Sequence, residues 1–255
     1  MADKPIRKYK APTKAPDEKK PPFKPGIAAH QRYRTADGMV CPGVTTVLGL
    51  LNKPALVPWA WKLGMQGLDY RKTLDQAANI GSIVHDMIDC FHKGTESNTD
   101  AYPLRDVQQA QVAFHNYVEW WTAQGLKCVG SEVGIVSEKH RFGGTIDRVA
   151  LKISTGKLWL IDTKTSKGIF PEHRYQQAAY KEAWNETHAA DEQIDETFIV
   201  RLDKETGAID FHSIGTDLTV ELNIFLHLRA IYELTGRLDN KRRADKEYRI
   251  PYWYD

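Results

Sequence analysis

Between Lys127 and Thr163 the apolar residues fall in short runs that are separated by glycines and other turn-forming residues. This spacing is typical of β-strands and does not fit a long amphipathic helix, so it predicts a sheet in the middle of the chain. The expected strands are 127–137, 142–153 and 157–163, followed by a helix at 171–187, a hairpin at 198–202 and 208–214, and a helix at 218–234. The last helix has apolar residues on nearly every face, so we expect it to be sandwiched between layers. This order of elements predicts an α/β protein with a mixed central β-sheet flanked by helices.

The chain before this sheet is predicted to be mostly helical. The expected elements are a hairpin at 31–41 and helical regions at 45–93 and 107–124. Ala36-Asp37-Gly38 supplies the hairpin turn, because an Asp-Gly pair favours a tight connection between extended runs. Thr45 or Thr46 is the expected cap of the first helix, and Gly125 is expected to end the second helical region.

The N-terminal segment differs in composition from the rest of the chain. Residues 1–26 carry eight cations against three anions, a net charge of +5, and hold six of the twelve prolines. A segment with few large apolar residues and frequent prolines cannot form a core, so we expect a disordered basic tail. The tail either contacts nucleic-acid phosphates or serves only as a solubilising linker. The remaining residues then carry a net charge of −3, because the whole chain carries +2.

The composition also excludes several protein classes. No apolar stretch approaches the roughly 18–20 residues that cross a bilayer, and the N-terminus lacks the apolar segment of a secretory signal. The three cysteines are an odd number and lie far apart, which favours reduced thiols over a disulfide framework. We therefore expect a cytoplasmic protein, in the host cytoplasm if it is viral, with no membrane partner.

The candidate chemistry lies on the strand that ends at Asp162-Thr163-Lys164. Side chains alternate along a strand, so Asp162 and Lys164 project to the same side. Asp147 lies 15 residues earlier on the preceding strand, so its carboxylate can lie beside that of Asp162. Two adjacent carboxylates repel each other unless a cation separates them, and carboxylate oxygens suit Mg²⁺ or Mn²⁺. The simpler alternative is a surface ion pair between Asp162 and Lys164, which contributes little to stability.

A divalent cation next to a lysine is a suitable arrangement for phosphodiester hydrolysis, because both offset the charge that grows on the phosphate. The sequence resembles a known family at this point. The matching motifs, in order, are Gly81-Ser82-Ile83-Val84-His85, Gly144-Thr145-Ile146-Asp147, Ile161-Asp162-Thr163-Lys164-Thr165-Ser166 and Gln176-Gln177-Ala178-Ala179-Tyr180. Together they resemble the RecB-like branch of the PD-(D/E)XK nuclease superfamily, which includes mitochondrial genome maintenance exonuclease and phage exonucleases.

The resemblance implies a role for each matching residue. Asp147 and Asp162 would bind the metal together with the carbonyl of Thr163 and the imidazole of His85, and Lys164 would be the catalytic lysine. The implied cofactor is Mg²⁺ or Mn²⁺. The four cysteines that hold an iron–sulfur cluster in some members are missing, so no such cluster is expected.

Three further residues have less definite roles. Gln176 and Tyr180 lie on one helical face, where they would position the substrate phosphate, brace Lys164 or form a buried polar pair. Glu132, on the strand before Asp147, matches a less regular acidic position of the family and is expected behind the metal ligands.

Two of the motifs also have an alternative, purely structural interpretation. A lone histidine in an apolar helical stripe, as His85 is, more often packs than binds a metal. Gly143 and Gly144 either relieve crowding or let a phosphate backbone approach.

The resemblance implies a PD-(D/E)XK nuclease fold with an N-terminal helical region. Residues 27–255 would then form a single nuclease domain. Its expected parts are 27–125, the hairpin and helical region carrying His85; 126–215, the catalytic sheet and helix; and 216–255, the C-terminal helix and tail.

The predicted function is metal-dependent exonuclease hydrolysis of DNA from free ends, in recombination, repair or phage DNA processing. The predicted partner is DNA that is single-stranded or has free ends. Two alternatives remain open at this point. One is a structure-specific or nicking endonuclease with the same metal site, and the other is an inactive nuclease fold that binds DNA.

Overall fold

In the computed structural model the described residues are 33–244, and side chains are described up to residue 237. The predicted basic tail at 1–26 lies outside this part of the chain. The elements in chain order are β1 (Tyr33–Arg34), β2 (Val40–Cys41), α1 (Val44–Leu48), α2 (Leu56–Met65), α3 (Tyr70–Lys93), α4 (Leu104–Ala123), β3 (Leu126–Ser137), β4 (Phe142–Lys152), β5 (Lys157–Lys164), α5 (Pro171–Thr187), the 3₁₀ turn η1 (Ala190–Glu192), β6 (Glu196–Leu202), β7 (Ile209–Gly215) and α6 (Thr219–Ala244).

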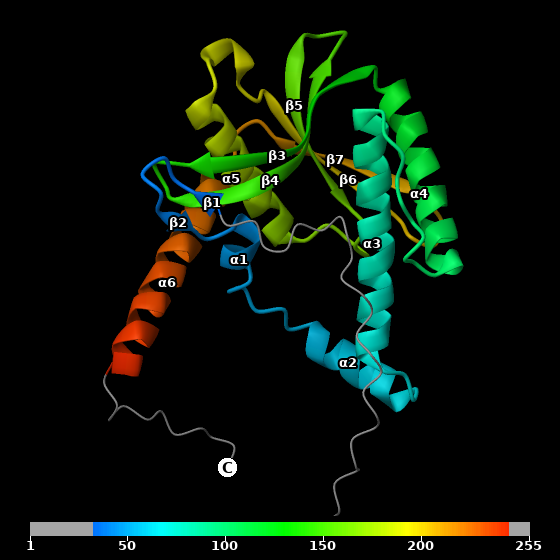
Figure 1. The fold of residues 1–255 in the computed structure, drawn as a ribbon, viewed down its shortest axis with the longest axis horizontal. Coiled ribbons are helices and arrows are strands. Elements are labelled where there is room, and N and C mark those ends of the chain that lie inside the picture. The colour runs from blue at the N-terminus through cyan, green and yellow to red at the C-terminus, as the bar shows by residue number, and fades with distance from the viewer. Residues whose placement is uncertain (1–32, 245–255) are drawn as a thin grey trace, which may run out of the picture.

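The centre of the fold is a five-stranded sheet in the order β3-β4-β5-β6-β7 (Figure 1). The pairs β3–β4, β4–β5 and β6–β7 are antiparallel. Strands β5 and β6 are parallel, because α5 carries the chain back to the starting edge between them. The predicted α/β fold with a mixed central sheet and flanking helices is confirmed.

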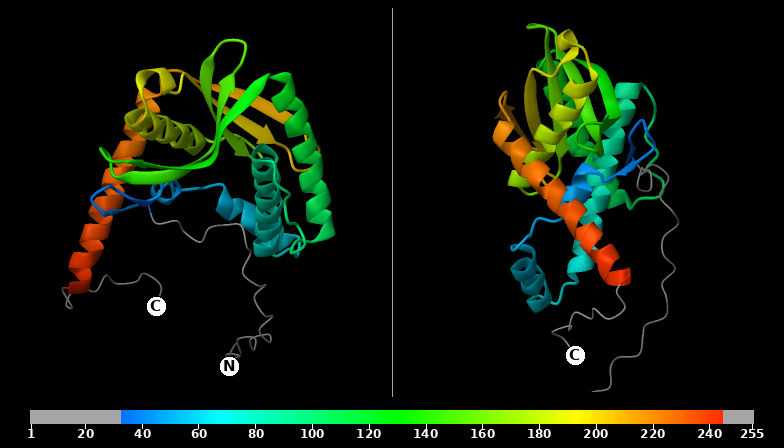
Figure 2. Two further views of the ribbon diagram at one scale, coloured as in Figure 1. Left: turned by 45° about the horizontal axis from the view of Figure 1, so that its top comes forward. Right: turned by 90° about the vertical axis from the view of Figure 1, so that its left-hand side faces the viewer.

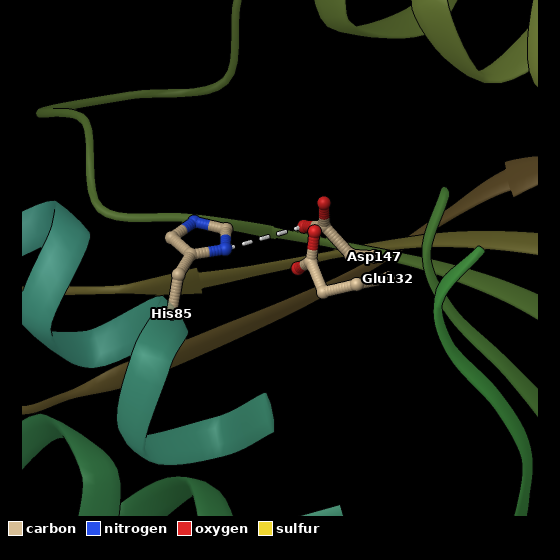
Figure 3. Close-up of side chains that lie close together, drawn as sticks. All are labelled: His85, Glu132 and Asp147. Carbon is tan, nitrogen blue, oxygen red and sulfur yellow. Dashed lines mark ion pairs between the residues drawn. The ribbon is translucent and has the colours of Figure 1, made fainter. Parts of the chain in front are cut away.

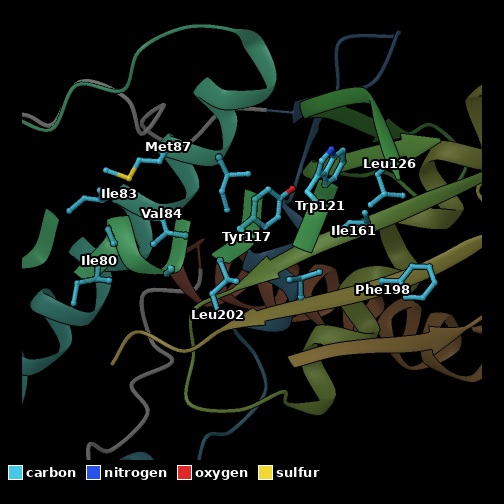
Figure 4. Close-up of a cluster of buried hydrophobic side chains, with 14 of the residues drawn as sticks. Ile80, Ile83, Val84, Met87, Tyr117, Trp121, Leu126, Ile161, Phe198 and Leu202 are labelled. Carbon is cyan, nitrogen blue, oxygen red and sulfur yellow. The ribbon is translucent and has the colours of Figure 1, made fainter. Parts of the chain in front are cut away.

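Helices cover both faces of this sheet. Helices α3 and α4 pack on one face through a large apolar cluster that includes Trp159 and Ile161 of β5 (Figure 4). On the other face, α5 packs with α1 and α6 against a second cluster that includes Leu160. Because β5 is buried on both faces, its sequence is a continuous apolar run and does not alternate between apolar and polar residues. Fully burying a side chain of this size contributes about 1.5–3 kcal/mol.

Helix α6 differs from the prediction. Phe225 is fully buried against the second cluster, but Val220, Ile231 and Leu234 are 69%, 49% and 63% exposed. The helix therefore packs along one side, where it contacts α5 and α1. Figure 2 shows it projecting away from the sheet. The prediction that this helix is sandwiched between layers is wrong, because apolar residues around a helix do not by themselves place a second layer over it.

Helix α1 also begins differently. Its N-cap is Gly43, in extended backbone with φ −72° and ψ 149°, and no side chain caps the helix. Thr45 and Thr46 lie inside the helix. The predicted threonine cap is therefore wrong.

No helix in residues 33–244 is both long enough and apolar enough to span a bilayer.

Candidate active site

Strands β4 and β5 separate at the candidate site. Their pairing ends at Arg148 and Ile161, and Asp147 and Asp162 are the next residues on the two strands. An oxygen of Asp147, Oδ2, accepts a hydrogen bond of 2.9 Å from the backbone N–H of Thr163. The carboxylate of Asp147 thus takes the place of a backbone acceptor just where the ladder opens. The structure places Asp147 and Asp162 at the same fork, as strand register predicts.

Three potential metal ligands, one of which is Asp147, lie close together. His85, Glu132 and Asp147 each offer one ligand atom, and these atoms all lie within 4.8 Å of one another (Figure 3). The Nδ1 atom of His85 lies 3.6 Å from Oδ2 of Asp147. The backbone of Thr163 lies close enough to His85 to raise its pKa, so the predicted carbonyl ligand lies beside the imidazole. These groups come from α3, β3, β4 and β5.

The helix α3 holds His85 at this point. Asp69 caps its first turn by accepting a 2.9 Å bond from the N–H of Arg71, and Gly94 ends it in the left-handed conformation at φ 66°. A buried stripe packs α3 on the sheet: Ile80, Ile83, Val84, Met87 and Ile88. His85 follows Val84 at the edge of this stripe, so its ring is only one-third exposed and faces the fork.

Glu132 occupies an unusual backbone position. Its neighbours Ser131 and Val133 pair with the residues on either side of Asp147, which places Glu132 opposite Asp147 on the adjacent strand. Its φ is 51°, in the left-handed region that non-glycine residues seldom adopt. Strain of this kind persists where the surrounding structure imposes it, and it often accompanies a functional site.

The electrostatics of the cluster suit a bound cation. Burial raises the pKa of Glu132 to about 7, and the nearby carboxylate of Asp147 adds to this effect. Burial also lowers the pKa of His85, against the opposing effect of Asp147. At neutral pH the imidazole is therefore neutral and its ring nitrogen can coordinate a metal. Two carboxylates with one imidazole form a donor set that fits Mn²⁺ or Mg²⁺.

A second group of polar side chains lies beside this cluster. The ammonium Nζ of Lys164 lies 2.9 Å from Oδ1 and 2.7 Å from Oδ2 of Asp162, whose side chain is 2% exposed. It also donates a 2.9 Å bond to Oε1 of Gln176. The amide of Gln176 in turn donates a 3.0 Å bond to the hydroxyl of Tyr180. This chain of contacts fixes the direction in which Lys164 points.

Lys164 is also held in its protonated, positively charged form. Burial opposes its protonated form, but Asp162 and Asp147 outweigh this and raise its pKa above the ordinary value. For Asp162 itself, burial raises the pKa, against the effect of Lys164. The lysine is therefore a fixed cation at the fork.

The family of the chain follows from comparison with known proteins. The sequence profile of the PD-(D/E)XK nuclease superfamily matches residues 58–248, about three-quarters of the chain. The chain belongs to this superfamily. The match spans every residue of the candidate site described above, so the resemblance seen in the sequence motifs is confirmed. Members of the superfamily are nucleases that use divalent metals, and the described part of this nuclease holds a candidate ligand cluster of one histidine and two carboxylates.

Solved structures with a similar fold have low sequence identity to this nuclease. A candidate exonuclease from Eubacterium rectale is 14% identical, with a TM-score of 0.44, and the match covers 64% of this chain and 68% of that one. LHK-Exo in complex with dAMP is 17% identical, with a TM-score of 0.38, and the match covers 68% of this chain and 92% of that one. A comparison with curated proteins gives no match.

The predicted ligand set differs from the cluster that the structure gathers. Glu132 lies in the cluster of the nuclease, although the sequence places it behind the ligands. Asp162 lies outside that cluster and pairs with Lys164 instead. The spacing held a signal for Glu132, because residues 132, 147 and 162 are separated by 15 residues each. Because the strands pair as two successive antiparallel hairpins, residues 132, 147 and 162 lie at the same level of three adjacent strands.

One residue of the site was missed. Arg148 is 1% exposed, and its guanidinium lies 3.4 Å from Oε1 of Glu132 and donates to the backbone carbonyl of Asp147. A buried cation thus lies beside the cluster, close enough to α3 to act on His85 and Asp89 as well. The motif places Arg148 directly after Asp147, but only the fold shows that it reaches Glu132.

The glycine pair has a structural role in the nuclease. A Cβ atom at Gly143 would lie 2.3 Å from the side chain of Tyr33, and one at Gly144 would lie 2.4 Å from the ring of Tyr180. Both distances are too short for any Cβ contact. The glycines therefore relieve crowding, one of the two roles considered from the sequence.

Proposed function

We propose that this nuclease is a metal-dependent DNA exonuclease that hydrolyses phosphodiester bonds from free ends during DNA recombination, repair or phage DNA processing. The observation that carries the hydrolytic part is the His85, Glu132 and Asp147 cluster beside the fixed ammonium of Lys164. Its exonuclease action is supported by the four ordered motifs that resemble the RecB-like exonucleases.

The residues of the chain divide the task between binding and positioning. His85, Glu132 and Asp147 would hold Mg²⁺ or Mn²⁺, with the Thr163 carbonyl beside them and Asp162 at the same fork. A cation bound there acidifies a water molecule and offsets negative charge on the phosphate. These ligands come from four separate elements, so folding of the whole domain assembles them.

Lys164 acts on the substrate phosphate. Its ammonium carries three hydrogens: Gln176 takes one, and when the two oxygens of Asp162 share another, the third can be donated to a non-bridging phosphate oxygen or to the attacking water. Gln176, held by Tyr180, prevents the lysine side chain from turning away. A fixed donor of this kind stabilises charge that develops during the reaction, and losing one such donor typically reduces kcat by about 10²–10³-fold.

The test is a cleavage time course on DNA labelled separately at each end. Linear single-stranded DNA, linear duplex, covalently closed circular DNA and RNA of matched sequence are compared in Mg²⁺, Mn²⁺ and excess EDTA. We expect stepwise loss of nucleotides from linear DNA in metal and none in EDTA. Degradation of the closed circle would replace the exonuclease with an endonuclease, and cleavage in EDTA would contradict the metal site.

A matched pair of variants links the activity to the site. Asp147→Asn removes a carboxylate of the cluster, and Asp191→Asn removes an exposed carboxylate on η1. We expect the first to abolish cleavage and the second to retain it. Equal activity of both variants would reject the assigned site. DNA binding without cleavage by the wild-type protein in any metal would favour the inactive nuclease fold.

A further inference from the structure

Two hydroxyl groups lie next to the candidate site without a role in the chemistry described so far. The hydroxyl of Tyr33 on β1 lies 3.0 Å from Oγ1 of Thr145 on β4. Both residues are partly exposed. The hairpin of β1 and β2 thereby brings a side chain from the start of the described chain onto the strand that carries Asp147.

The ring of Tyr33 is held in place by the strand below it. Gly143 has no Cβ, and the side chain of Tyr33 occupies the space where that atom would lie. The N–H of Gly143 also donates a 3.0 Å bond to the carbonyl of Pro42, which follows β2. A ring fixed along its length presents its hydroxyl at a defined point, with little conformational freedom left to lose when a ligand binds.

The position of this pair relative to the site follows from strand geometry. Thr145 and Asp147 are two residues apart on β4, so their side chains project to the same side, about 6.6 Å apart along the strand. This is comparable to the spacing of neighbouring phosphates along a nucleic-acid strand. Thr145 therefore lies about one phosphate spacing from Asp147 along the strand, on the same side of β4.

Hydrogen counting shows that the pair can still donate. Each hydroxyl carries one hydrogen, and their mutual bond uses only one of the two. Among the residues with described side chains, neither hydroxyl has another acceptor. One hydroxyl hydrogen therefore remains for a ligand that carries an acceptor oxygen.

We propose that the hydroxyls of Tyr33 and Thr145 form a phosphate-binding subsite, which donates a hydrogen bond to a non-bridging oxygen of the phosphate adjacent to the one that is cleaved. This inference rests on the proposed nuclease function and deepens it. The subsite fixes the register of the substrate strand relative to the fork. A purely structural role, in which the bond only attaches the β1–β2 hairpin to β4, is the competing explanation that the experiment must separate.

The experiment combines protein variants with modified DNA. Tyr33→Phe and Thr145→Val each remove one hydroxyl while keeping most of the packing, Thr145→Ser retains the hydroxyl, and Tyr175→Phe is a control on α5, where the ring lines a pocket with residues of α6. Each is assayed on oligonucleotides in which a single phosphate is replaced by an uncharged methylphosphonate, at successive positions on both sides of the cleaved bond. Melting temperatures are measured in parallel.

We expect Tyr33→Phe to raise KM about tenfold, as for a lost hydrogen bond to a charged group, with kcat nearly unchanged. At one methylphosphonate position next to the cleaved bond, the KM of the wild-type enzyme should rise by a similar factor. The KM of Tyr33→Phe should rise no further at that position. Thr145→Ser should behave as the wild type. If no position couples to the hydroxyls, or if the melting temperature falls while KM is unchanged, the pair is structural and the proposal is wrong.

A binding measurement separates this proposal from the proposed function. Affinity for the same fluorescent oligonucleotides is measured in EDTA, where no cleavage is expected. If the wild-type protein binds DNA but does not cleave it in metal, the proposed nuclease function is wrong. The subsite proposal is still tested, because it depends only on whether the effects of Tyr33→Phe and of the methylphosphonate on binding are coupled. If Tyr33→Phe weakens binding equally for every methylphosphonate position, the subsite proposal is wrong even if the nuclease is active.

Discussion

The ion pair of Asp162 and Lys164 makes a quantitative prediction about stability. In Lys164→Met the carboxylate of Asp162, which is 2% exposed, keeps its burial but loses its cation. Breaking a buried pair in this way costs about 3–5 kcal/mol. Asp162 can avoid part of this cost by taking up a proton. From its ordinary pKa of 3.8, protonation costs about 5.7 kcal/mol at pH 8 and about 1.6 kcal/mol at pH 5.

The loss of stability must therefore depend on pH. At pH 8 protonation costs more than the broken pair, so we expect Lys164→Met to lower the free energy of unfolding by about 3–5 kcal/mol. At pH 5 protonation becomes the cheaper route, and the loss from this source is at most about 1.6 kcal/mol, because burial also raises the pKa of the wild-type carboxyl and that carboxyl takes up a proton too. The sign is fixed because burial and the missing cation both raise the pKa of Asp162, so the carboxyl ionises unfavourably as pH rises.

Urea denaturation in EDTA at the two pH values measures this effect. The double variant Lys164→Met with Asp162→Asn removes the unpaired charge, so it should recover much of the stability at pH 8. The control is Lys157→Met, which breaks the exposed pair with Glu196 at the other end of β5 and should cost at most about 1 kcal/mol. Equal losses for Lys164→Met at pH 5 and pH 8, or additive effects in the double variant, would refute the reasoning.

Two further predictions concern packing and metal binding. Gly144→Ala would place a Cβ atom 2.4 Å from the buried ring of Tyr180, so we expect a loss of about 1–3 kcal/mol in urea denaturation. Gly168→Ala, whose Cβ would meet only Phe170 at 4.0 Å, serves as the control, and equal stability of the two variants would contradict the described packing. Because the pKa of Glu132 is raised to about 7, protons compete with the metal below that pH. The Mg²⁺ affinity measured by calorimetry should therefore fall from pH 8 to pH 6, and less steeply in Glu132→Gln; a pH-independent affinity in the wild-type protein would show that Glu132 is not a ligand.

The sheet could be predicted well because local signals agree with the global fold. The three strands between residues 126 and 164 are bounded by turn residues, and α5 begins at the proline and ends at the threonine that the sequence indicates. Local agreement of this kind leaves few alternatives for a chain to adopt. In contrast, the exposed side of α6 could not be predicted, because a helix pattern gives no information about which neighbours cover it.

The site was predictable to the extent that it depends on strand periodicity and register. Asp162 and Lys164 share a face because they are two residues apart, and Asp147 reaches them through an antiparallel pair. The position of Glu132 depends on a left-handed residue within β3, which no pattern of residue types specifies. Contacts from distant segments, such as Tyr33 on Thr145, require the packed structure itself.

The paired glycines at 143 and 144 each make room for a tyrosine from a different element, on opposite sides of one strand. Evolutionary variation at these positions should therefore be linked to the rings and not to the metal. Relatives in which a small side chain replaces Tyr33 should tolerate alanine at 143, whether or not they keep their catalytic residues. An aligned set of relatives would then show covariation between 33 and 143, and between 180 and 144, that reports ring packing rather than catalysis.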